Sequence, residues 1–478
     1  MKNDKHLTRR ELLKKSALGV GTIIGVPSLC SAQGGRGGRG GPPLPIATDN
    51  PSIIHNQRYC RNCGRCRLFC RDVTTVFGHP VPKGEDACIH CGQCTKYCRR
   101  SAIRERYHYP DVAKAIADTG KIVVASTSPA IRVALGEMFR LPPGTNVEGK
   151  IVASLKKLGV DYVLDTTFAA DLTIMEESAE LLRRLDEKGS LPMFTSCCPA
   201  WVRFAKLFYP NFLPNISTTK SPVMMQGVLV KTYFAEKTGI DPSKIVHVAL
   251  TPCTAKKAEI LLPGMNAAGI MNGNVEMRDI DYVLTTRELA YLLNTGKINL
   301  AESDDSVYNS MMGAGSGAGM IFGNTGGVME AALRTAYQKL NDALPPNEFY
   351  RMESVRGLDS VRQATVDLGK RKLRVAVVHG IGKARPLLNA IQNGDASFDF
   401  VEVMACPGGC IGGGGQPINQ QMDAMRLNQM RLASLYQQDK TSEIRMSYEN
   451  PEIKAVYKDF LGEPLGIKSE QLLHVTNR

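Results

Sequence analysis

Residues 402–417 have the sequence EVMACPGGCIGGGGQP, in which a short apolar run leads into two cysteines and a row of glycines. The run before Cys406 has the length and composition of a buried strand, and Pro407 with the glycines after it predicts a tight turn. Open α/β sheets carry their active sites at the carboxyl ends of their strands. We therefore predict an α/β fold with Cys406 and Cys410 at the end of a strand, in the active site.

Two further segments have the same form. Residues 194–201, FTSCCPAW, contain the adjacent Cys197 and Cys198, and residues 245–259, IVHVALTPCTAKKAE, contain Cys253. In each segment an apolar run is followed by a cysteine that neighbours a proline, which again predicts a buried strand and a turn. The three segments together predict that five cysteines lie at strand ends, where such sheets place their active sites.

Eight of the 14 cysteines lie between residues 60 and 98, in two runs with the spacing C-x2-C-x2-C-x3-C. This is the spacing of bacterial two-cluster ferredoxins, in which the last cysteine of each run binds the other run's 4Fe–4S cluster. Because each run supplies one ligand to the other run's cluster, the two clusters are held close together, as electron transfer between them requires. Zinc knuckles, or disulfides in an oxidising compartment, are the alternatives. The predicted ligands are Cys60, Cys63, Cys66 and Cys98 for one cluster, and Cys88, Cys91, Cys94 and Cys70 for the other.

The overall composition is that of a globular protein, with 43% hydrophobic and 22% charged residues. The formal net charge is +13, of which residues 1–32 contribute +4. A solvated basic surface would explain this excess, and so would attraction of an acidic redox partner. Because no basic stretch is interleaved with aromatic residues, we do not expect a nucleic acid partner.

The first 32 residues have the features of a targeting peptide. The pair Arg9-Arg10 resembles the signal for the bacterial twin-arginine (Tat) route, which exports folded proteins that already hold their cofactors. Residues 16–29 are apolar but too few and too rich in glycine for a stable membrane span. Lipidation of Cys30 is an alternative use of this segment. We expect a periplasmic protein that is exported by the Tat machinery.

The three cysteine segments resemble the signature motifs of the iron-only (FeFe) hydrogenases. Residues 170–177 (ADLTIMEE), 281–288 (DYVLTTRE) and 326–334 (GGVMEAALR) agree as well, and the resemblance covers about residues 55–478. It implies the reaction H2 ⇌ 2H⁺ + 2e⁻ in an α/β catalytic domain of two lobes, with mostly parallel sheets around an H-cluster. This cofactor is a 4Fe–4S cubane joined through a cysteine sulfur to a diiron unit with CO, cyanide and a bridging dithiolate.

The resemblance also implies roles for the five downstream cysteines. Cys198, Cys253, Cys406 and Cys410 would bind the cubane, with Cys410 as the bridge to the diiron unit. The glycines after Cys410 would let the backbone approach the cofactor closely. Cys197 would stay off the metal and pass a proton in the heterolytic cleavage of H2, a task that suits a thiol because its pKa lies near enough to neutrality to give and take protons. A buried inert thiol is the alternative for Cys197.

A proton path out of the site is implied at Glu177, Ser217, Glu180 and Arg184. The two glutamates and Arg184 are spaced i, i+3 and i+7, which places them on one face of a helix. A solvated helix face with a salt bridge is the alternative interpretation of this spacing.

Further residues would surround the diiron unit. Lys256 would donate a charge-assisted hydrogen bond to one cyanide ligand, and Pro129 and Ala130 would line the other. Met404 and Phe322 would form an apolar wall that excludes water, with ordinary core packing as the alternative.

The sequence departs from the family's usual pattern at two positions beside this pocket. Thr251 stands where methionine usually precedes the Pro-Cys of the second motif, and Val223 stands where glutamine is usual. We expect these changes to alter the polarity of the pocket, its sensitivity to inhibitors or the catalytic bias, without removing a metal ligand.

The C-terminal residues predict a helix with clear ends. Asn450 is a suitable N-cap, Pro451 suits the first turn, and Gly462 follows the helix expected at residues 452–461. Residues 450–474 resemble the hydrogenase small-subunit segment, whose helices wrap the catalytic domain. The predicted organisation is a Tat signal at residues 1–32, a Gly/Pro-rich linker at 33–52, an α+β ferredoxin domain at 53–108, a catalytic domain at 109–422 and a small-subunit-like segment at 423–478.

The expected activity is periplasmic H2 uptake, with electrons leaving through two 4Fe–4S clusters to a c-type cytochrome or a ferredoxin. Hydrogenase maturases would be needed to install the diiron unit. A non-turnover H2 sensor is one alternative, but such relatives carry a sensory domain and lack the cysteine found here at position 197. An iron–sulfur assembly or scaffold protein of the same superfamily is the other.

Overall fold

The structure is a computed structural model that describes residues 41–419 and 422–475. The predicted signal at residues 1–32, with Cys30, lies outside the described residues, as do residues 33–40 of the predicted linker. Within the described ranges, no helix combines the length and the apolar character that crossing a bilayer requires.

One sheet is entirely parallel, with the strand order β4-β3-β6-β7. In its register, Ala125 of the central strand β3 lies between Val163 and Val248. All four strands are short and almost fully buried, as expected for a parallel sheet that is covered on both faces. Their bounds are Ile122–Thr127 (β3), Tyr162–Asp165 (β4), Ile245–Leu250 (β6) and Tyr282–Leu284 (β7).

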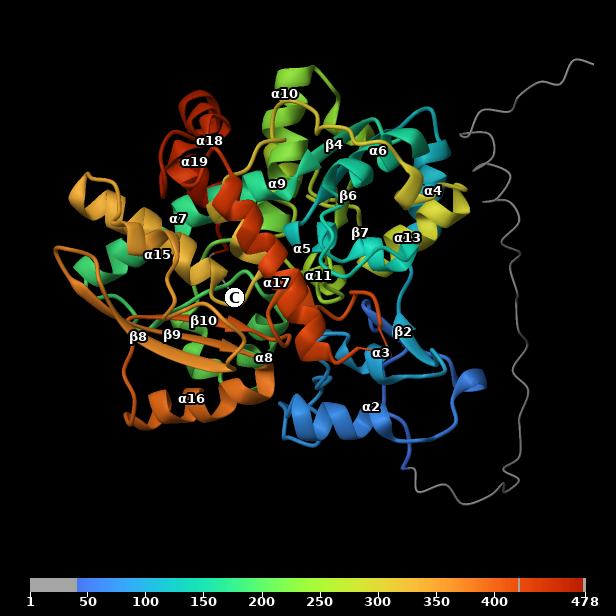
Figure 1. Ribbon diagram of the computed structural model, residues 1–478, viewed down its shortest axis with the longest axis horizontal. Coiled ribbons are helices and arrows are strands. Elements are labelled where there is room, and N and C mark those ends of the chain that lie inside the picture. Colours follow the sequence, from blue (N-terminus) through green and yellow to red (C-terminus); the bar gives the residue numbers. More distant parts are fainter. Residues whose placement is uncertain (1–40, 420–421, 476–478) are drawn as a thin grey trace, which may run out of the picture.

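Helices cover both faces of this sheet (Figure 1). Val123 and Ala125 face one layer, whereas Val124 between them faces the other, because successive side chains of a strand alternate. The first layer consists of α4 (Tyr109–Ala117), α6 (Glu148–Leu158) and α13 (Thr286–Thr295). The second consists of α7 (Thr166–Asp186) and α9 (Pro222–Leu229).

The second sheet has the strand order β5-β10-β9-β8, and only its edge strand β8 is antiparallel. Its strands are β5 (Met193–Phe194), β8 (Val361–Asp367), β9 (Lys372–His379) and β10 (Phe400–Met404). Helices α8 (Pro199–Phe208) and α16 (Ile381–Asn393) pack on one face, and α7 and α15 (Gly327–Asn341) pack on the other. Because α7 contributes to the cores of both sheets, it joins them into one body.

The predicted α/β core with mostly parallel strands is therefore confirmed. Strands β5, β6 and β10 precede the three cysteine segments, and β3 precedes Pro129 and Ala130, so that four strand ends from two sheets meet at one place. The other α-helices between β3 and β10 are short: α5 (Pro129–Arg132), α10 (Ala235–Thr238), α11 (Lys256–Glu259), α12 (Ala267–Met271) and α14 (Gly317–Met320).

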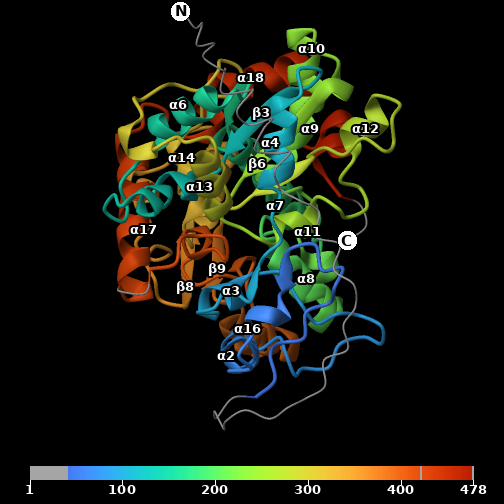
Figure 2. The same cartoon turned by 90° about the vertical axis from the view of Figure 1, so that its right-hand side faces the viewer.

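The cysteine-rich part lies at one end of the molecule, beside α16 (Figure 2). Strands β1 (Ile53–His55) and β2 (Ile103–Glu105) form an antiparallel pair that brackets the two cysteine runs. Each run contains a short helix, α2 (Arg65–Leu68) in the first and α3 (Gln93–Tyr97) in the second. Gly64 and Gly92, which precede these helices, both have φ of 67°, a left-handed conformation that glycine adopts without strain. The two runs are thus alike in conformation as well as in spacing.

The C-terminal helices lie against the catalytic part of the chain. They are α17 (Ala424–Thr441), α18 (Pro451–Val456) and α19 (Ile467–Leu473). Asn450 caps α18 by accepting a hydrogen bond from the backbone N–H of Glu452, and its amide also binds the buried carboxylate of Asp171 on α7. The predicted cap and the predicted end at Gly462 are confirmed, and the last part of the helix, Tyr457–Leu461, is a π-helical turn.

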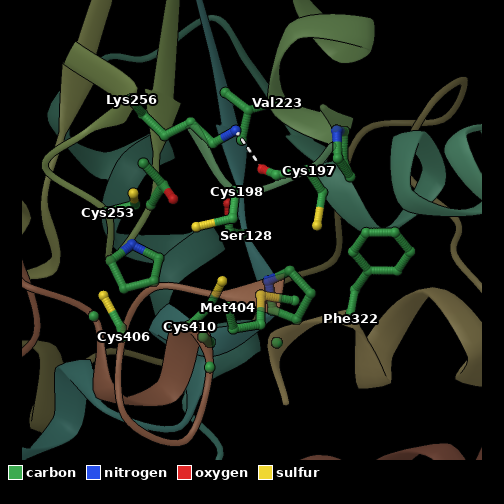
Figure 3. A pocket seen from close by; sticks show the side chains of 18 of the residues that line it. Ser128, Cys197, Cys198, Val223, Cys253, Lys256, Phe322, Met404, Cys406 and Cys410 are labelled. Carbon is green, nitrogen blue, oxygen red and sulfur yellow. Dashed lines mark hydrogen bonds between the residues drawn. The ribbon is translucent and has the colours of Figure 1, made fainter. Parts of the chain in front are cut away.

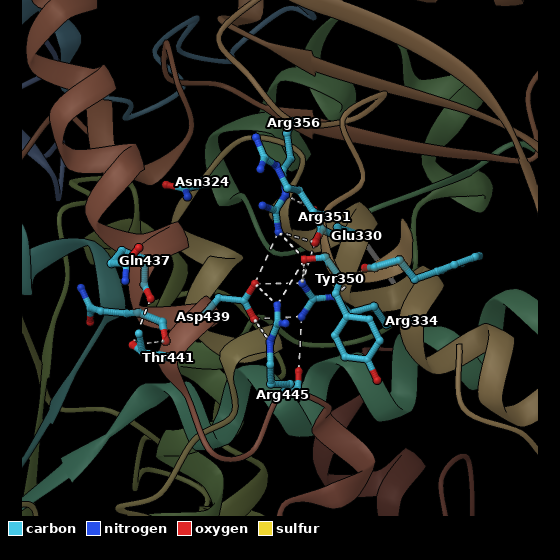
Figure 4. A network of polar contacts seen from close by, with 12 residues as sticks. Asn324, Glu330, Arg334, Tyr350, Arg351, Arg356, Gln437, Asp439, Thr441 and Arg445 are labelled. Carbon is cyan, nitrogen blue, oxygen red and sulfur yellow. Dashed lines mark hydrogen bonds and ion pairs between the residues drawn. The ribbon is translucent and has the colours of Figure 1, made fainter. Parts of the chain in front are cut away.

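A buried network of charges attaches α17 to α15 (Figure 4). The guanidinium of Arg334 lies 2.6 Å from Glu330 on its own helix and 2.9 Å from Asp439 on α17, and all three side chains are at most 1% exposed. Arg356 also pairs with Glu330, and Arg445 with Asp439. Burying a carboxylate costs free energy, and here cations offset that cost.

We expect Arg334→Met to lower the free energy of unfolding by about 3 kcal/mol, because it leaves two buried carboxylates partly uncompensated. The value lies at the lower end for a broken buried pair, since Arg356 and Arg445 remain. Urea unfolding followed by circular dichroism would measure the midpoint. Arg351→Met is the control, because its pair with Glu353 is exposed and should hardly move the midpoint. Equal midpoints for the two variants would contradict a structural role of the network.

Candidate active site

A cavity lies where the four strands end, and four cysteine side chains converge on it (Figure 3). Cys198 comes from the turn between β5 and α8, Cys253 from the turn between β6 and α11, and Cys406 and Cys410 from the loop after β10. The loops are held to one another by backbone contacts, such as the Gly415 N–H that donates to the Pro252 carbonyl at 2.8 Å. The four thiols predicted as cubane ligands are therefore brought together.

The chemistry of these four side chains fits a metal cluster. Burial is the main cause that raises the pKa of each thiol, to about 11 for Cys406 and about 12 for Cys410. Thiolates, not thiols, bind metals, so this site needs strong positive charge to ionise its cysteines. A cationic iron–sulfur core supplies such charge.

Cys197 points away from this group, although it is the chain neighbour of Cys198 (Figure 3). Its side chain is 9% exposed and packs against Ala170, Phe322 and Met404 in a small apolar cluster. Burial first, and then the nearby charge of Glu177, raises the pKa of the Cys197 thiol well above its usual value. Burial and the carboxylate both favour the neutral thiol, and the proton-passing role of Cys197 stays a prediction.

The other predicted pocket residues all line the same cavity: Pro129, Ala130, Lys256, Phe322 and Met404, together with the two departures Val223 and Thr251. The Lys256 ammonium is buried, donates to the Cys197 carbonyl at 3.1 Å and pairs with Glu259 at 2.7 Å. It is a fixed cation at the cavity wall and suits an anionic ligand. The wall is otherwise apolar, which keeps bulk water out.

The predicted proton path lies on and beside α7. Glu177 and Glu180 are each 1% exposed, so the alternative of a solvated helix face is wrong. The Ser217 hydroxyl donates to Glu180 at 2.7 Å, and the Arg184 guanidinium lies 2.6 Å from the same carboxylate. Arg184, whose side chain is 12% exposed, reaches the surface and donates to the Asn215 and Ile216 carbonyls.

Electrostatics keep Glu180 ionised. Burial opposes its charge, but the Arg184 guanidinium and hydrogen bonds from Ser217 and the Thr218 backbone outweigh burial and hold its pKa below the usual value. An ionised carboxylate that accepts hydrogen bonds can take up a proton and release it toward Arg184 at the surface.

The residues that fix the Ser217 segment were not found by sequence reasoning. His474 accepts or donates a hydrogen bond at 2.8 Å with the Thr218 hydroxyl, and the Lys220 and Val475 backbone N–H groups bond across to Leu473 and Thr218. The other ring nitrogen of His474 lies 3.1 Å from Glu176, whose carboxylate also accepts from the Tyr457 hydroxyl at 2.5 Å. We call the segment at residues 473–475 the C-terminal clamp.

A second cavity lies in the cysteine-rich part and is lined by Cys70, Cys88, Cys91 and Cys94. These are the four residues predicted to share one ferredoxin-type cluster, including Cys70 from the other run. For the other predicted set, the charges of Cys63 and Cys98 both act on Cys66, so these three thiols also lie near one another.

The two cysteine centres adjoin. Gln93 and Lys96 donate to the Gly412 carbonyl at 2.8 and 3.2 Å, and a Cβ at Gly414 would overlap the Cys91 carbonyl oxygen. The glycine run was expected to give room to a cofactor. Gly409 and Gly413 do line the cavity, but Gly414 instead permits close packing on the cysteine-rich part, because only a residue without a side chain fits there.

Three more buried contacts, all absent from the sequence predictions, support this junction. The Arg287 guanidinium pairs with Glu105 of β2 at 2.6 Å and donates to the Gln416 carbonyl at 2.9 Å. The Gln416 amide donates to the Ala130 carbonyl at 2.9 Å, which ties the glycine-rich loop to the turn after β3. Arg287 belongs to the stretch 281–288, so the resemblance of that stretch was the available signal.

Known proteins resemble the chain over most of its length. The family profile for the iron-only hydrogenase large subunit, C-terminal domain, matches residues 121–414, and that for the iron hydrogenase small subunit matches residues 425–476. The NADP-reducing hydrogenase subunit HndD of Solidesulfovibrio fructosivorans is 43% identical over 88% of this chain and 74% of that protein. The periplasmic [Fe] hydrogenase large subunit of Nitratidesulfovibrio vulgaris is 43% identical over 77% of this chain and 88% of that protein.

Cytosolic iron–sulfur assembly component 3 of Mus musculus is 33% identical over 74% of each chain. Among solved structures, a variant of the [FeFe]-hydrogenase HydA1 from Chlamydomonas reinhardtii aligns with a TM-score of 0.66 and 40% identity, over 77% of this chain and 98% of that one. Sequence, fold and cysteine geometry agree. The chain belongs to the iron-only (FeFe) hydrogenase family, whose members are oxidoreductases that act on H2 and carry an H-cluster with further iron–sulfur clusters.

Proposed function

We propose that the chain is an exported hydrogenase that oxidises H2 in the periplasm and passes the electrons out through two ferredoxin-type 4Fe–4S clusters. The single observation that carries the proposal is the adjacency of the two cysteine centres. The charge of Cys406 acts on the Cys91 thiol and raises its pKa, so the two thiols lie near each other, and the backbones of the two parts meet at Gly414. Clusters at these sites would lie close enough to exchange electrons, and the ferredoxin-type cysteines would lead them toward the surface.

The residues around the cavity have separate tasks in this proposal. Cys198, Cys253, Cys406 and Cys410 would hold the cubane, and Lys256, Pro129 and Ala130 would orient the cyanide ligands. When bound, the diiron unit would supply an open iron position that polarises H2. Phe322 and Met404 close the cavity to water, so that charge separation there depends on the protein's own groups.

The proton would move along the chain's own side chains. The neutral Cys197 thiol is the group that gives and takes a proton at the cavity, and Glu177 is the carboxylate that acts on it. Ser217 and Glu180 share a hydrogen bond, so that a proton can pass between them without large motion. Arg184 holds Glu180 at the outer end and keeps it ionised for the next proton.

Export is supported by two observations. The pair Arg9-Arg10 within residues 1–32 resembles a Tat signal, and a relative with 43% identity is a periplasmic hydrogenase subunit. The Tat route accepts folded proteins, which suits a chain whose clusters must be inserted before export. Maturases would act on the protein before it leaves the cytoplasm.

The proposal is tested by H2 uptake with protein matured with its diiron unit. Protein-film voltammetry should show an oxidation current under H2, and cell fractionation should place the activity in the periplasm. Infrared bands of iron-bound CO and cyanide should accompany the activity. The bands without turnover would favour an H2 sensor, and their absence would favour an assembly protein. Good H2 evolution with negligible oxidation current would contradict the uptake direction.

A further inference from the structure

The end of the cysteine-rich part that faces away from the catalytic cavity is open to solvent. Of the thirteen described cysteines, Cys63 is the exposed one, and Cys60 and Cys98 of the same predicted set are partly exposed. Cys88, Cys91 and Cys94 instead line a cavity next to the catalytic part. If electrons pass through both clusters, the one near Cys63 is where they leave the protein.

Positive charge is concentrated in the cysteine-rich part. Residues 57–104 contain ten Lys or Arg and three Asp or Glu, so that +7 of the chain's +13 lies in a tenth of its length. The one acidic residue within positions 57–73, Asp72, is bound to Arg71 at 2.6 Å. The exposed arginines that directly flank the first cluster's cysteines form what we call the arginine face: Arg58, Arg61, Arg65, Arg99 and Arg100.

Apolar and aromatic side chains accompany these arginines. Tyr59 is 61% exposed, Leu68 48% and Tyr97 44%. The ring of Tyr97 at the end of α3 stacks on Phe69, the residue that follows α2, with centroids 4.0 Å apart, so that the ends of the two helices present one continuous surface. Arginine and aromatic residues are enriched at the centres of protein interfaces, where they supply contact area and charge pairing. A merely solvated basic surface would not require exposed aromatic rings beside a cysteine centre.

We propose that the arginine face docks a small acidic electron-carrier protein, one whose redox centre is surrounded by carboxylates, rather than a lysine-rich cytochrome. The inference rests on the proposed function, in which electrons leave through the ferredoxin-type clusters. Each H2 that is oxidised releases two protons and two electrons, so two molecules of a one-electron carrier are reduced in each turnover. Opposite potentials steer such a carrier to the arginine face, whereas a lysine-rich protein is repelled.

The test compares two one-electron carriers on the mature holoenzyme: an acidic single-cluster ferredoxin and a lysine-rich monohaem cytochrome c. Isothermal titration calorimetry at low ionic strength measures binding of each oxidised carrier without turnover. H2-dependent reduction of each carrier gives its KM, and methyl viologen, which needs no docking surface, gives the reference rate. We expect the ferredoxin to bind at least about tenfold more tightly than the cytochrome, and this preference to shrink as salt is added.

Charge-neutralising variants locate the surface. The combined variant Arg61→Gln, Arg65→Gln and Arg100→Gln should bind ferredoxin about tenfold or more weakly and should raise the KM for ferredoxin by a similar factor. The viologen-coupled rate of the same variant is the reference for its catalytic activity. The matched control removes the same charge from exposed lysines elsewhere: Lys157→Gln, Lys188→Gln and Lys244→Gln combined. It should change the affinity and the KM for ferredoxin less than about twofold.

Two outcomes would overturn the inference: tighter binding of the cytochrome, or equal effects of the arginine and lysine variants. If the native holoenzyme showed no viologen-coupled H2 uptake, the proposed function would instead be overturned. Calorimetry would still decide whether the acidic carrier binds the arginine face, so the two failures can be told apart.

Discussion

Cys197→Ala is expected to lower H2 turnover by about a thousandfold or more, because it removes the only described thiol that faces the cavity from outside the ligand set. The alanine cannot hold or pass a proton, and the apolar wall of Phe322 and Met404 admits no water to replace it. Viologen-coupled H2 uptake measures the loss. The iron–sulfur absorption and electron paramagnetic resonance spectra should be kept, since Cys198, Cys253, Cys406 and Cys410 remain.

The control for this variant tests packing at the same place. Met404→Leu keeps the volume and the apolar character of the wall, so its rate should stay within about an order of magnitude of the native rate. Full activity of Cys197→Ala would show that protons leave the cavity by another way. Loss of the cluster spectra would show instead that Cys197 supports the metal centre.

Glu180→Gln is expected to slow turnover by about a hundredfold or more. The amide can still accept the Ser217 hydrogen bond, but it can neither take up a proton nor pair with Arg184 as an anion. The native rate should fall with decreasing pH as Glu180 becomes protonated, at a pH below the usual carboxylate range, because its pKa is lowered. The variant should lack this acidic limb. The measurement is the H2 turnover rate of the native protein and of the variant as a function of pH, together with the solvent isotope effect.

The same shift has a consequence for stability. Because the pKa of Glu180 is lower in the folded than in the unfolded chain, its ionised form stabilises the fold at neutral pH, and this contribution is lost as the pH falls through the folded-state pKa. Glu187→Gln, at the exposed end of α7, is the matched control and should leave rate and pH profile unchanged. Identical profiles for the two variants would remove Glu180 from the proton path.

The sequence allowed prediction of the parts of this protein that have a local pattern. The apolar runs before Cys253 and Cys406 correspond to β6 and β10, and the spacing of Glu177, Glu180 and Arg184 corresponds to one helix. The burial of that helix face could not be predicted, because it depends on strands and helices far away in the chain. Burial also favours the neutral form of the Cys197 thiol, through residues that lie far from it in the sequence.

Contacts between distant residues were beyond the reach of these patterns. Arg287 and Glu105 are 182 residues apart, and neither has a neighbour that signals the pair. His474 and Glu176 are 298 residues apart. A histidine near a helix end has many uses, and only the folded chain brings this one to the Ser217 segment. The glycine run was visible as a motif, but its partner, the Cys91 carbonyl, was not.

The C-terminal clamp links proton conduction to cooperativity. Residues 218–220 share backbone hydrogen bonds with residues 473 and 475, so neither segment can open without exposing the other's amides to solvent. Hydrogen exchange in the two segments should therefore proceed together, as one unit of local unfolding. A molecule in which this unit has opened would keep every metal ligand and yet lose the alignment of Ser217 with Glu180. Such a molecule would show the full spectra of its clusters and yet have no H2 turnover.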